Sequence, residues 1–139
     1  MPNRENAVRV AGTKVLVIDD EHMIRWSIEE TLRAAGYEVA AAETAAKGMR
    51  LFRLFRPQVV FLDLRLPDEE GGTILKRIKQ EGGARAAVIV MTAYGESCPV
   101  ARAMRLGAYA YLKKPFDFDQ IEIVTRGAVK QLLAQSALT

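Results

Sequence analysis

VVFLDLRLPDEEGG, residues 59–72, decides the fold of this chain of 139 residues. Its first four residues are apolar and rich in branched and aromatic side chains, which is typical of a strand buried on both faces. Asp63 follows this run directly, and Pro67, Gly71 and Gly72 then indicate a loop that leads to a helix at residues 73–80. The segment therefore predicts one β/α unit with an acidic residue at the end of its strand.

The same alternation of apolar runs and amphipathic stretches continues on both sides of this segment. The expected strands are residues 14–18, 37–42, 59–62, 87–91 and 109–112. The expected helices are residues 23–35, Thr44 to Arg56, 73–80, Ser97 or Cys98 to Gly107, and a last one opened by a capping box of Asp117 and Gln120. We predict an open, doubly wound α/β fold, in which a five-stranded parallel sheet is flanked by five helices. The flavodoxin-like strand order 2-1-3-4-5 fits this pattern.

Composition places the chain among ordinary folded domains, because half of its residues are hydrophobic and 27% are charged. We expect a flexible N-terminal tail at residues 1–12, one domain at 13–135, and a tail or the start of a linker at 136–139. The net charge of +3 raises the question of nucleic acid. Its basic residues are dispersed, however, and we interpret Arg50, Arg53 and Arg56 as a solvated helix face, so direct binding of nucleic acid is not expected.

No apolar run is long enough to span a bilayer, so we expect no contact with a membrane. The first dozen residues lack the apolar stretch of a signal peptide. Cys98 is the single cysteine, which excludes an internal disulfide and suits a reducing compartment. We therefore expect a cytoplasmic protein.

Acidic residues end two neighbouring strands of the predicted sheet. Asp19 and Asp20 follow the first strand, and Asp63 follows the third. Ligands of such sheets bind outside the carboxyl ends of the strands, so we expect these three carboxylates to converge. Their charges repel one another unless a cation joins them, and hard oxygen ligands suit Mg²⁺. The sequence therefore predicts a site for a divalent metal, Mg²⁺ or Mn²⁺.

Two further polar residues end the fourth and fifth strands. Thr92 closes one, and Lys114 closes the other immediately before Pro115. A hydroxyl and an ammonium beside a metal form a receptor for an anion, and phosphoryl transfer needs its equatorial oxygens neutralised. We expect Asp63 to act as the nucleophile, Lys114 to neutralise charge, and Thr92 to donate to a phosphoryl oxygen.

Four segments of the chain resemble the receiver family of two-component response regulators. They are VLVIDDE (15–21), VVFLDLRLPDEEGG (59–72), VIVMTAYG (88–95) and LGAYAYLKKPF (106–116). The resemblance extends over roughly residues 13–133 and implies the receiver fold. MTAYG followed by LGAYAYLKKPFD is similar, more narrowly, to the receivers of NtrC-like activators of sigma-54 promoters.

The resemblance implies a role for each matching position. Asp63 would be the phosphoacceptor, Asp20 a direct metal ligand, Asp19 a ligand acting mainly through water, and the backbone carbonyl of Arg65 a further ligand. Thr92 and Lys114 would read the phosphoryl group. Tyr111 resembles the switch aromatic that moves inward when the threonine follows the phosphoryl group, although a tyrosine in a short strand also serves plain packing.

The resemblance also implies partners and an output. The donor would be the phosphohistidine of a cognate sensor histidine kinase, and the chain would catalyse only its own phosphorylation and dephosphorylation. The changed surface would lie on the last two helices and the fifth strand, and would control an output such as transcription through a downstream domain. The chain is then either an excised receiver or a stand-alone one.

Apolar residues on the last helix bear on self-association. The expected core stripe consists of Ile121, Val124, Ala128 and Leu132, and the residues off that stripe are Ile123, Val129 and Leu133. Extra apolar residues of this kind favour a homodimer through the last two helices and the fifth strand, although scattered exposed apolar residues are also common.

Three other functions fit parts of the pattern. A phosphatase of the haloacid-dehalogenase type needs an acid two residues after the nucleophile, where this chain has Arg65. A nucleotide- or flavin-binding module needs a glycine-rich turn after the first strand, where Asp19 and Asp20 stand instead. A pseudo-receiver, which binds partners without phosphorylation, usually lacks part of the acidic set or the lysine, all of which are present here.

Overall fold

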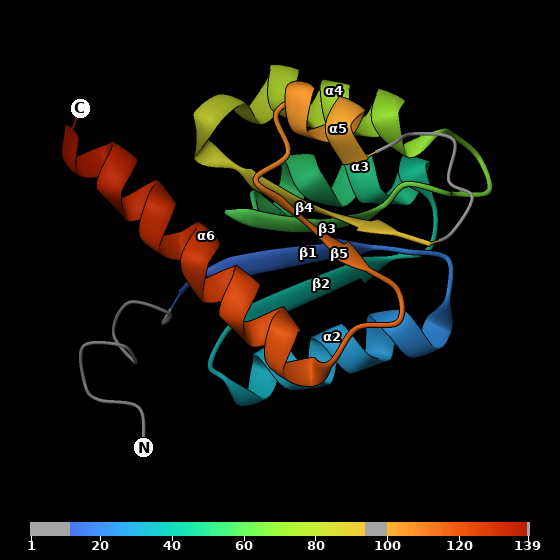
Figure 1. The fold of residues 1–139 in the computed structure, drawn as a ribbon, viewed down its shortest axis with the longest axis horizontal. Coiled ribbons are helices and arrows are strands. Elements are labelled where there is room, and N and C mark those ends of the chain that lie inside the picture. The colour runs from blue at the N-terminus through green and yellow to red at the C-terminus, as the bar shows by residue number, and fades with distance from the viewer. Residues whose placement is uncertain (1–11, 94–99, 139) are drawn as a thin grey trace.

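A computed structural model describes residues 12–93 and 100–138 of the chain. Its centre is a five-stranded parallel sheet in the order β2-β1-β3-β4-β5. The strands are β1 (Lys14–Ile18), β2 (Glu38–Ala42), β3 (Val59–Asp63), β4 (Ala87–Thr92) and β5 (Ala110–Lys113). The predicted strand order and fold class are confirmed (Figure 1).

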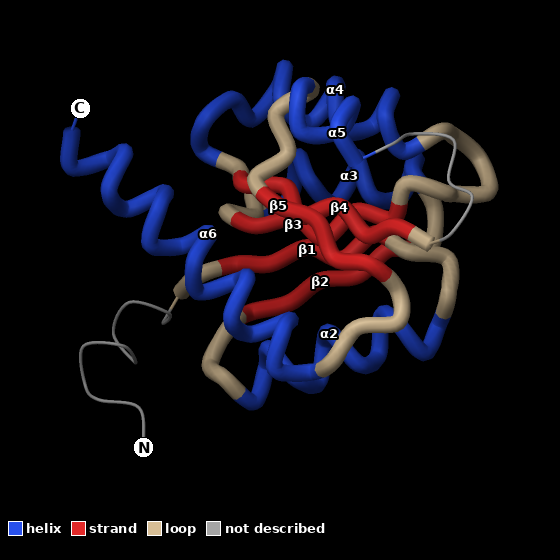
Figure 2. Tube along the Cα trace, in the orientation of Figure 1, coloured by secondary structure: helices blue, strands red, loops and turns tan. Residues whose placement is uncertain are grey.

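Within the described residues, five α-helices cover both faces of the sheet. They are α2 (His22–Ala34), α3 (Ala45–Phe55), α4 (Gly71–Gly82), α5 (Val100–Arg105) and α6 (Phe118–Leu138), and a short 3₁₀ turn (Gly83–Arg85) follows α4. Figures 1 and 2 show α2 and α6 on one face and α3, α4 and α5 on the other. The molecule is thus a three-layer α/β/α arrangement.

The sheet separates two apolar cores. Every residue of β3 and β4 is buried, and alternate residues of each strand face opposite layers. Leu16 and Ile18 pack with the layer of α3 and α4, whereas Val15 and Val17 pack with the layer of α2 and α6. Two-sided burial explains why β3 and β4 are apolar up to their last residues, Asp63 and Thr92, as the sequence indicated.

Several element boundaries differ from the predicted ones. Asp63 and Thr92 are the last residues of β3 and β4 rather than the residues after them. Helix α4 begins at Gly71, two residues earlier than expected. The backbone is so close there that a Cβ on Gly71 would lie 2.3 Å from Leu64 Cα, and the Gly71 N–H donates to the Leu64 carbonyl. Among the described residues α5 begins at Val100, and its predicted start at Ser97 or Cys98 lies outside them.

Helix α6 buries a wider face than predicted. The Asp117 N–H donates to Gln120 Oε1 over 2.8 Å, which is one half of the expected capping box. Ile121 and Ala128 are buried as expected, but the placement of Val129 outside the core was wrong, because Val129 packs with them in the same cluster. Ile123 and Leu133 remain exposed. No helix of the described chain is long and apolar enough to cross a membrane.

Candidate functional site

Three carboxylates meet at the carboxyl edge of the sheet. Asp19 follows β1 directly, Asp20 comes next, and Asp63 ends the neighbouring strand β3. One oxygen of each lies within 4.8 Å of the others. Asp19 and Asp63 are almost completely buried, whereas Asp20 is exposed. The convergence expected from the strand order is therefore present.

Backbone N–H groups hold the two buried carboxylates in place. Asp19 Oδ1 accepts a hydrogen bond of 2.8 Å from the Glu21 N–H, and Asp63 Oδ1 accepts one of 3.0 Å from the Arg65 N–H. Each bond joins an aspartate to the amide two residues later, a local turn that aspartate commonly makes. Both Oδ2 atoms then face the ammonium of Lys114, which lies directly after β5.

The Lys114 ammonium is shared among three acidic side chains. It donates hydrogen bonds to Glu21 Oε1 at 3.1 Å and to Asp63 Oδ2 at 3.4 Å. It lies even closer to Asp19 Oδ2, at 2.9 Å, but outside hydrogen-bonding geometry. This contact is therefore an ion pair without a hydrogen bond.

The residues present fit a divalent cation. Within residues 12–93 and 100–138, Asp19 Oδ2 is the one buried side-chain oxygen or nitrogen without a hydrogen-bond partner. The Lys114 ammonium lies 2.9 Å from this oxygen, and a hard cation would satisfy its remaining acceptor capacity. Asp20 and Asp63 supply further oxygens within reach of the same point.

The pKa values of these groups reflect burial and crowding. Burial raises the pKa of Asp63 to about 7, and the charge of Asp19 adds to this effect. Burial likewise raises the pKa of Asp19. Burial alone would lower the pKa of Lys114, but its contacts with the acids, Asp19 foremost, hold that pKa above the usual value. Two neighbouring carboxylates resist being ionised at the same time because their charges repel each other. A bound cation would relieve this repulsion.

Of the other predicted site residues, Thr92 lies at the same edge of the sheet, whereas Tyr111 lies further back along β5, paired with Val90. Thr92 is buried at the end of β4, and its carbonyl accepts a 2.7 Å hydrogen bond from the Lys114 N–H. Tyr111 lies on β5 with its side chain 52% exposed, so it points outward. Lys113, the neighbour of Lys114, is exposed.

The structure adds residues that sequence reasoning did not assign. Glu21 contacts Lys114, although the sequence showed it only as part of an acidic run. In the loop after Asp63, Glu69 pairs with Arg77 and Glu70 pairs with Arg102, both at 3.0 Å. The second pair ties this loop to α5. The sequence showed the acidic run at residues 68–70, but it did not show which basic residues pair with it.

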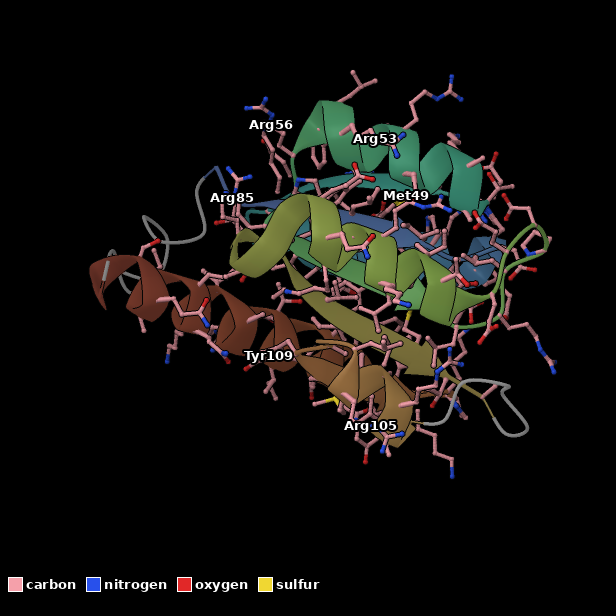
Figure 3. The ribbon with its side chains drawn as sticks, turned by 90° about the horizontal axis from the view of Figure 1, so that it is seen from above. Met49, Arg53, Arg56, Arg85, Arg105 and Tyr109 are labelled. Carbon is pink, nitrogen blue, oxygen red and sulfur yellow. The ribbon has the colours of Figure 1, made fainter. Side chains whose placement is uncertain are left out.

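A second hollow lies at the opposite edge of the sheet. It is a cavity of about 440 Å³, and its lining includes Arg53, Arg56 and Arg85 together with Pro57 and Ala86, which precede β3 and β4. Figure 3 shows these arginines around the ends of α3 and α4. Arg53 forms a two-point contact with Glu81, at 2.9 and 3.0 Å. This cavity is separate from the carboxylate site.

Comparisons with known proteins agree with the geometry. Residues 15–126 match the model of the response regulator receiver domain. Sporulation initiation phosphotransferase F of Bacillus subtilis is 37% identical over 120 residues, which cover 86% of this chain and 93% of that protein. A response regulator receiver domain protein from Clostridium thermocellum, known from its crystal structure, has a TM-score of 0.82 and 32% identity, over 91% of this chain and 99% of that one.

A third relative matches the narrower expectation from the sequence. The DNA-binding transcriptional regulator NtrC of Escherichia coli is 34% identical over 121 residues, which cover 87% of this chain. This chain spans only 26% of NtrC. The expected likeness to NtrC is confirmed by this match. With its strand order, its converging carboxylates and its match over most of its length, the chain belongs to the family of response regulator receiver domains.

Proposed function

We propose that the chain accepts a phosphoryl group on Asp63 from the phosphohistidine of a sensor histidine kinase. The observation that carries this proposal is the convergence of Asp19, Asp20 and Asp63 beside the Lys114 ammonium. A nucleophile, a cation site and a fixed positive charge are the parts that phosphoryl transfer needs.

The residues divide the work of transfer among them. A carboxylate oxygen of Asp63 forms the new bond to phosphorus while the bond from phosphorus to the histidine nitrogen breaks, and that nitrogen keeps the electron pair. Asp19, Asp20, Asp63 and the Arg65 carbonyl would hold Mg²⁺ or Mn²⁺, which when bound offsets the charge of the phosphoryl oxygens. Lys114 offsets the same charge from the protein side, and the Thr92 hydroxyl donates to one phosphoryl oxygen.

The chain would act on itself rather than on a separate substrate. The phosphoryl group stays on Asp63 until water removes it, so the chain catalyses only its own phosphorylation and dephosphorylation. Arg65 stands where a phosphatase of the haloacid-dehalogenase type has its acid, and a guanidinium does not release a proton at ordinary pH. A signalling role therefore fits better than turnover of phosphate esters.

Phosphorylation would bias an equilibrium between two conformations. Thr92 would move toward the phosphoryl group, and Tyr111, now outward, would move into the space that it leaves. The face of α5, β5 and α6 would change as a result. By likeness to the DNA-binding transcriptional regulator NtrC, we further propose that the output is transcription, controlled through a downstream domain.

The same face supports our proposal of a homodimer. A hollow of about 550 Å³ lies between β5 and α6, with Ile123 on its rim. Among the side chains that the structure describes on α5, β5 and α6, the large exposed apolar ones are Met104, Tyr111, Phe118, Ile123 and Leu133. Exposed apolar groups of this number favour a protein partner. A cytoplasmic location and the lack of nucleic-acid binding by this domain stay predictions.

Intact mass spectrometry after incubation with acetyl phosphate and Mg²⁺ tests the proposed function. We expect the wild type to gain one phosphoryl group, and Asp63→Asn or omission of Mg²⁺ to prevent the gain. Glu69→Gln, in the adjacent loop, is a matched control that should still be modified. No gain in folded wild-type protein would favour a pseudo-receiver that binds partners without phosphorylation.

A further inference from the structure

Glu21 has an unusual position for a residue that starts a helix. It is the N-cap of α2, yet within the described chain its side chain caps no backbone N–H of that helix. Its carboxylate instead reaches Lys114, 93 positions later in the chain, at 3.1 Å. The Glu21 N–H is bound to Asp19 Oδ1 at 2.8 Å, which sets the backbone from which the side chain extends.

Glu21 and Asp63 share the same ammonium, that of Lys114. Lys114 Nζ lies 2.9 Å from Asp19, 3.1 Å from Glu21 and 3.4 Å from Asp63, so the phosphoacceptor is the most distant of the three. A phosphoryl group on Asp63 needs this ammonium, and a contact that holds the ammonium toward Glu21 stabilises the unphosphorylated arrangement. The negative charge of Glu21 also opposes the approach of an anionic donor.

We propose that Glu21 is a positioning residue that restrains phosphoryl binding by holding Lys114 toward the start of α2. This inference rests on the proposed function of Asp63. The same charge acts in the opposite direction on a cation, because it adds to the negative potential around Asp19 and Asp20. Glu21 therefore favours the metal and disfavours the phosphoryl group.

The test is that one substitution should change the affinities for the metal and for a phosphoryl mimic in opposite directions. Glu21→Gln should weaken the affinity for Mg²⁺ alone and strengthen the affinity for beryllofluoride, an inorganic mimic of the phosphoryl group, at saturating Mg²⁺. Because the Glu21 side chain is 59% exposed, each change should be about two- to fivefold. Local damage to the site would weaken both affinities together.

Both titrations can be followed through Trp26, the only tryptophan, which lies half-exposed on α2. Glu21→Asp keeps the charge on a shorter side chain. Its Mg²⁺ affinity should therefore be close to that of the wild type, whereas its beryllofluoride affinity should lie nearer to that of Glu21→Gln. Glu43→Gln is the matched control, because Glu43 follows β2 at the same edge but pairs with Lys47 at 3.3 Å. It should change neither affinity by more than about 1.5-fold.

The outcomes separate the two proposals. Shifts of the same sign in Glu21→Gln, or shifts no larger than those of Glu43→Gln, would overturn the role of Glu21 while leaving a working receiver. A wild type that binds no beryllofluoride in the presence of Mg²⁺ would overturn the proposed function itself, and the role of Glu21 with it.

Discussion

Asp68 and Ala45 are joined by a hydrogen bond of 2.9 Å, although 23 positions separate them in the chain. The second oxygen of Asp68 accepts from the Ala46 N–H at 3.0 Å, and Thr44 Oγ1 accepts from the Lys47 N–H at 3.2 Å. The first three N–H groups of α3 are therefore all bound by side chains. The loop that follows Asp63 is tied in this way to the start of another helix.

Asp68→Ala should destabilise the protein by about 1–2 kcal/mol, because two helix-terminal N–H groups lose their acceptor. The bond from Ala45 holds the pKa of Asp68 below its ordinary value. Its stabilising effect is therefore present above pH 4 and lost as the pH falls through the lowered pKa. Urea unfolding at pH 7 measures the loss. Asp68→Asn, which keeps one acceptor oxygen, should lose less, and an equal loss would argue against the capping role.

The stability of the metal-free protein should fall as the pH rises from about 4 to about 7. Asp63 has a pKa of about 7 when folded and an ordinary value of 3.8, so the folded state binds the extra proton in this window. The slope contributed by one such group is at most about 1.4 kcal/mol per pH unit. Thermal unfolding of the wild type and Asp63→Asn across this range isolates the effect. A wild-type slope that matches that of the variant would contradict the prediction.

Gly71→Ala should destabilise the loop between β3 and α4 severely. The added Cβ would lie 2.3 Å from Leu64 Cα, a backbone atom that cannot move without displacing Arg65. We expect a loss of about 3 kcal/mol or more and a weaker affinity for Mg²⁺. Urea unfolding and Mg²⁺ titration check both effects. Thr73→Ala, on the exposed side of the same helix, is the control and should behave like the wild type.

Ile123→Glu should weaken self-association through the face of α5, β5 and α6. Ile123 is 66% exposed, so the substitution leaves the core intact but places a charge on the proposed dimer face. We expect at least a tenfold weaker dimer by sedimentation velocity. Leu54→Glu carries the same change on α3, where Leu54 is 76% exposed, and should leave association unaltered. Equal effects of both variants would show that the interface lies elsewhere.

The strand order and the meeting of the acidic residues were predictable from the sequence. Each strand is an apolar run ended by a polar residue, and parallel strands bring those ends to one edge. Asp19, Asp63 and Lys114 were therefore expected to be neighbours before any distance was known. Such reasoning needs only the backbone topology.

The contacts of individual side chains were not predictable in the same way. The reach of Glu21 to Lys114 depends on where α2 starts relative to the end of β5, which no local pattern encodes. Asp68 was visible as an acidic loop residue, but its partner on α3 was not. Gly71 appeared as a loop residue because glycine disfavours helices, whereas close packing against Leu64 requires it there. The predicted four-residue stripe also underestimated the buried face of α6, because it left out Val129.

Helix α6 is longer than the part of it that packs against the sheet. It is fixed against the sheet by Ile121, Ala128 and Val129, while its last turns extend past the sheet edge (Figure 1). At a rise of about 1.5 Å per residue, Leu138 lies roughly 14 Å along the axis from Val129. A tilt of only about 10° there would displace the far end by about 2 Å. The helix is thus a lever arm, which converts a small repacking beside β5 into a larger displacement at its far end.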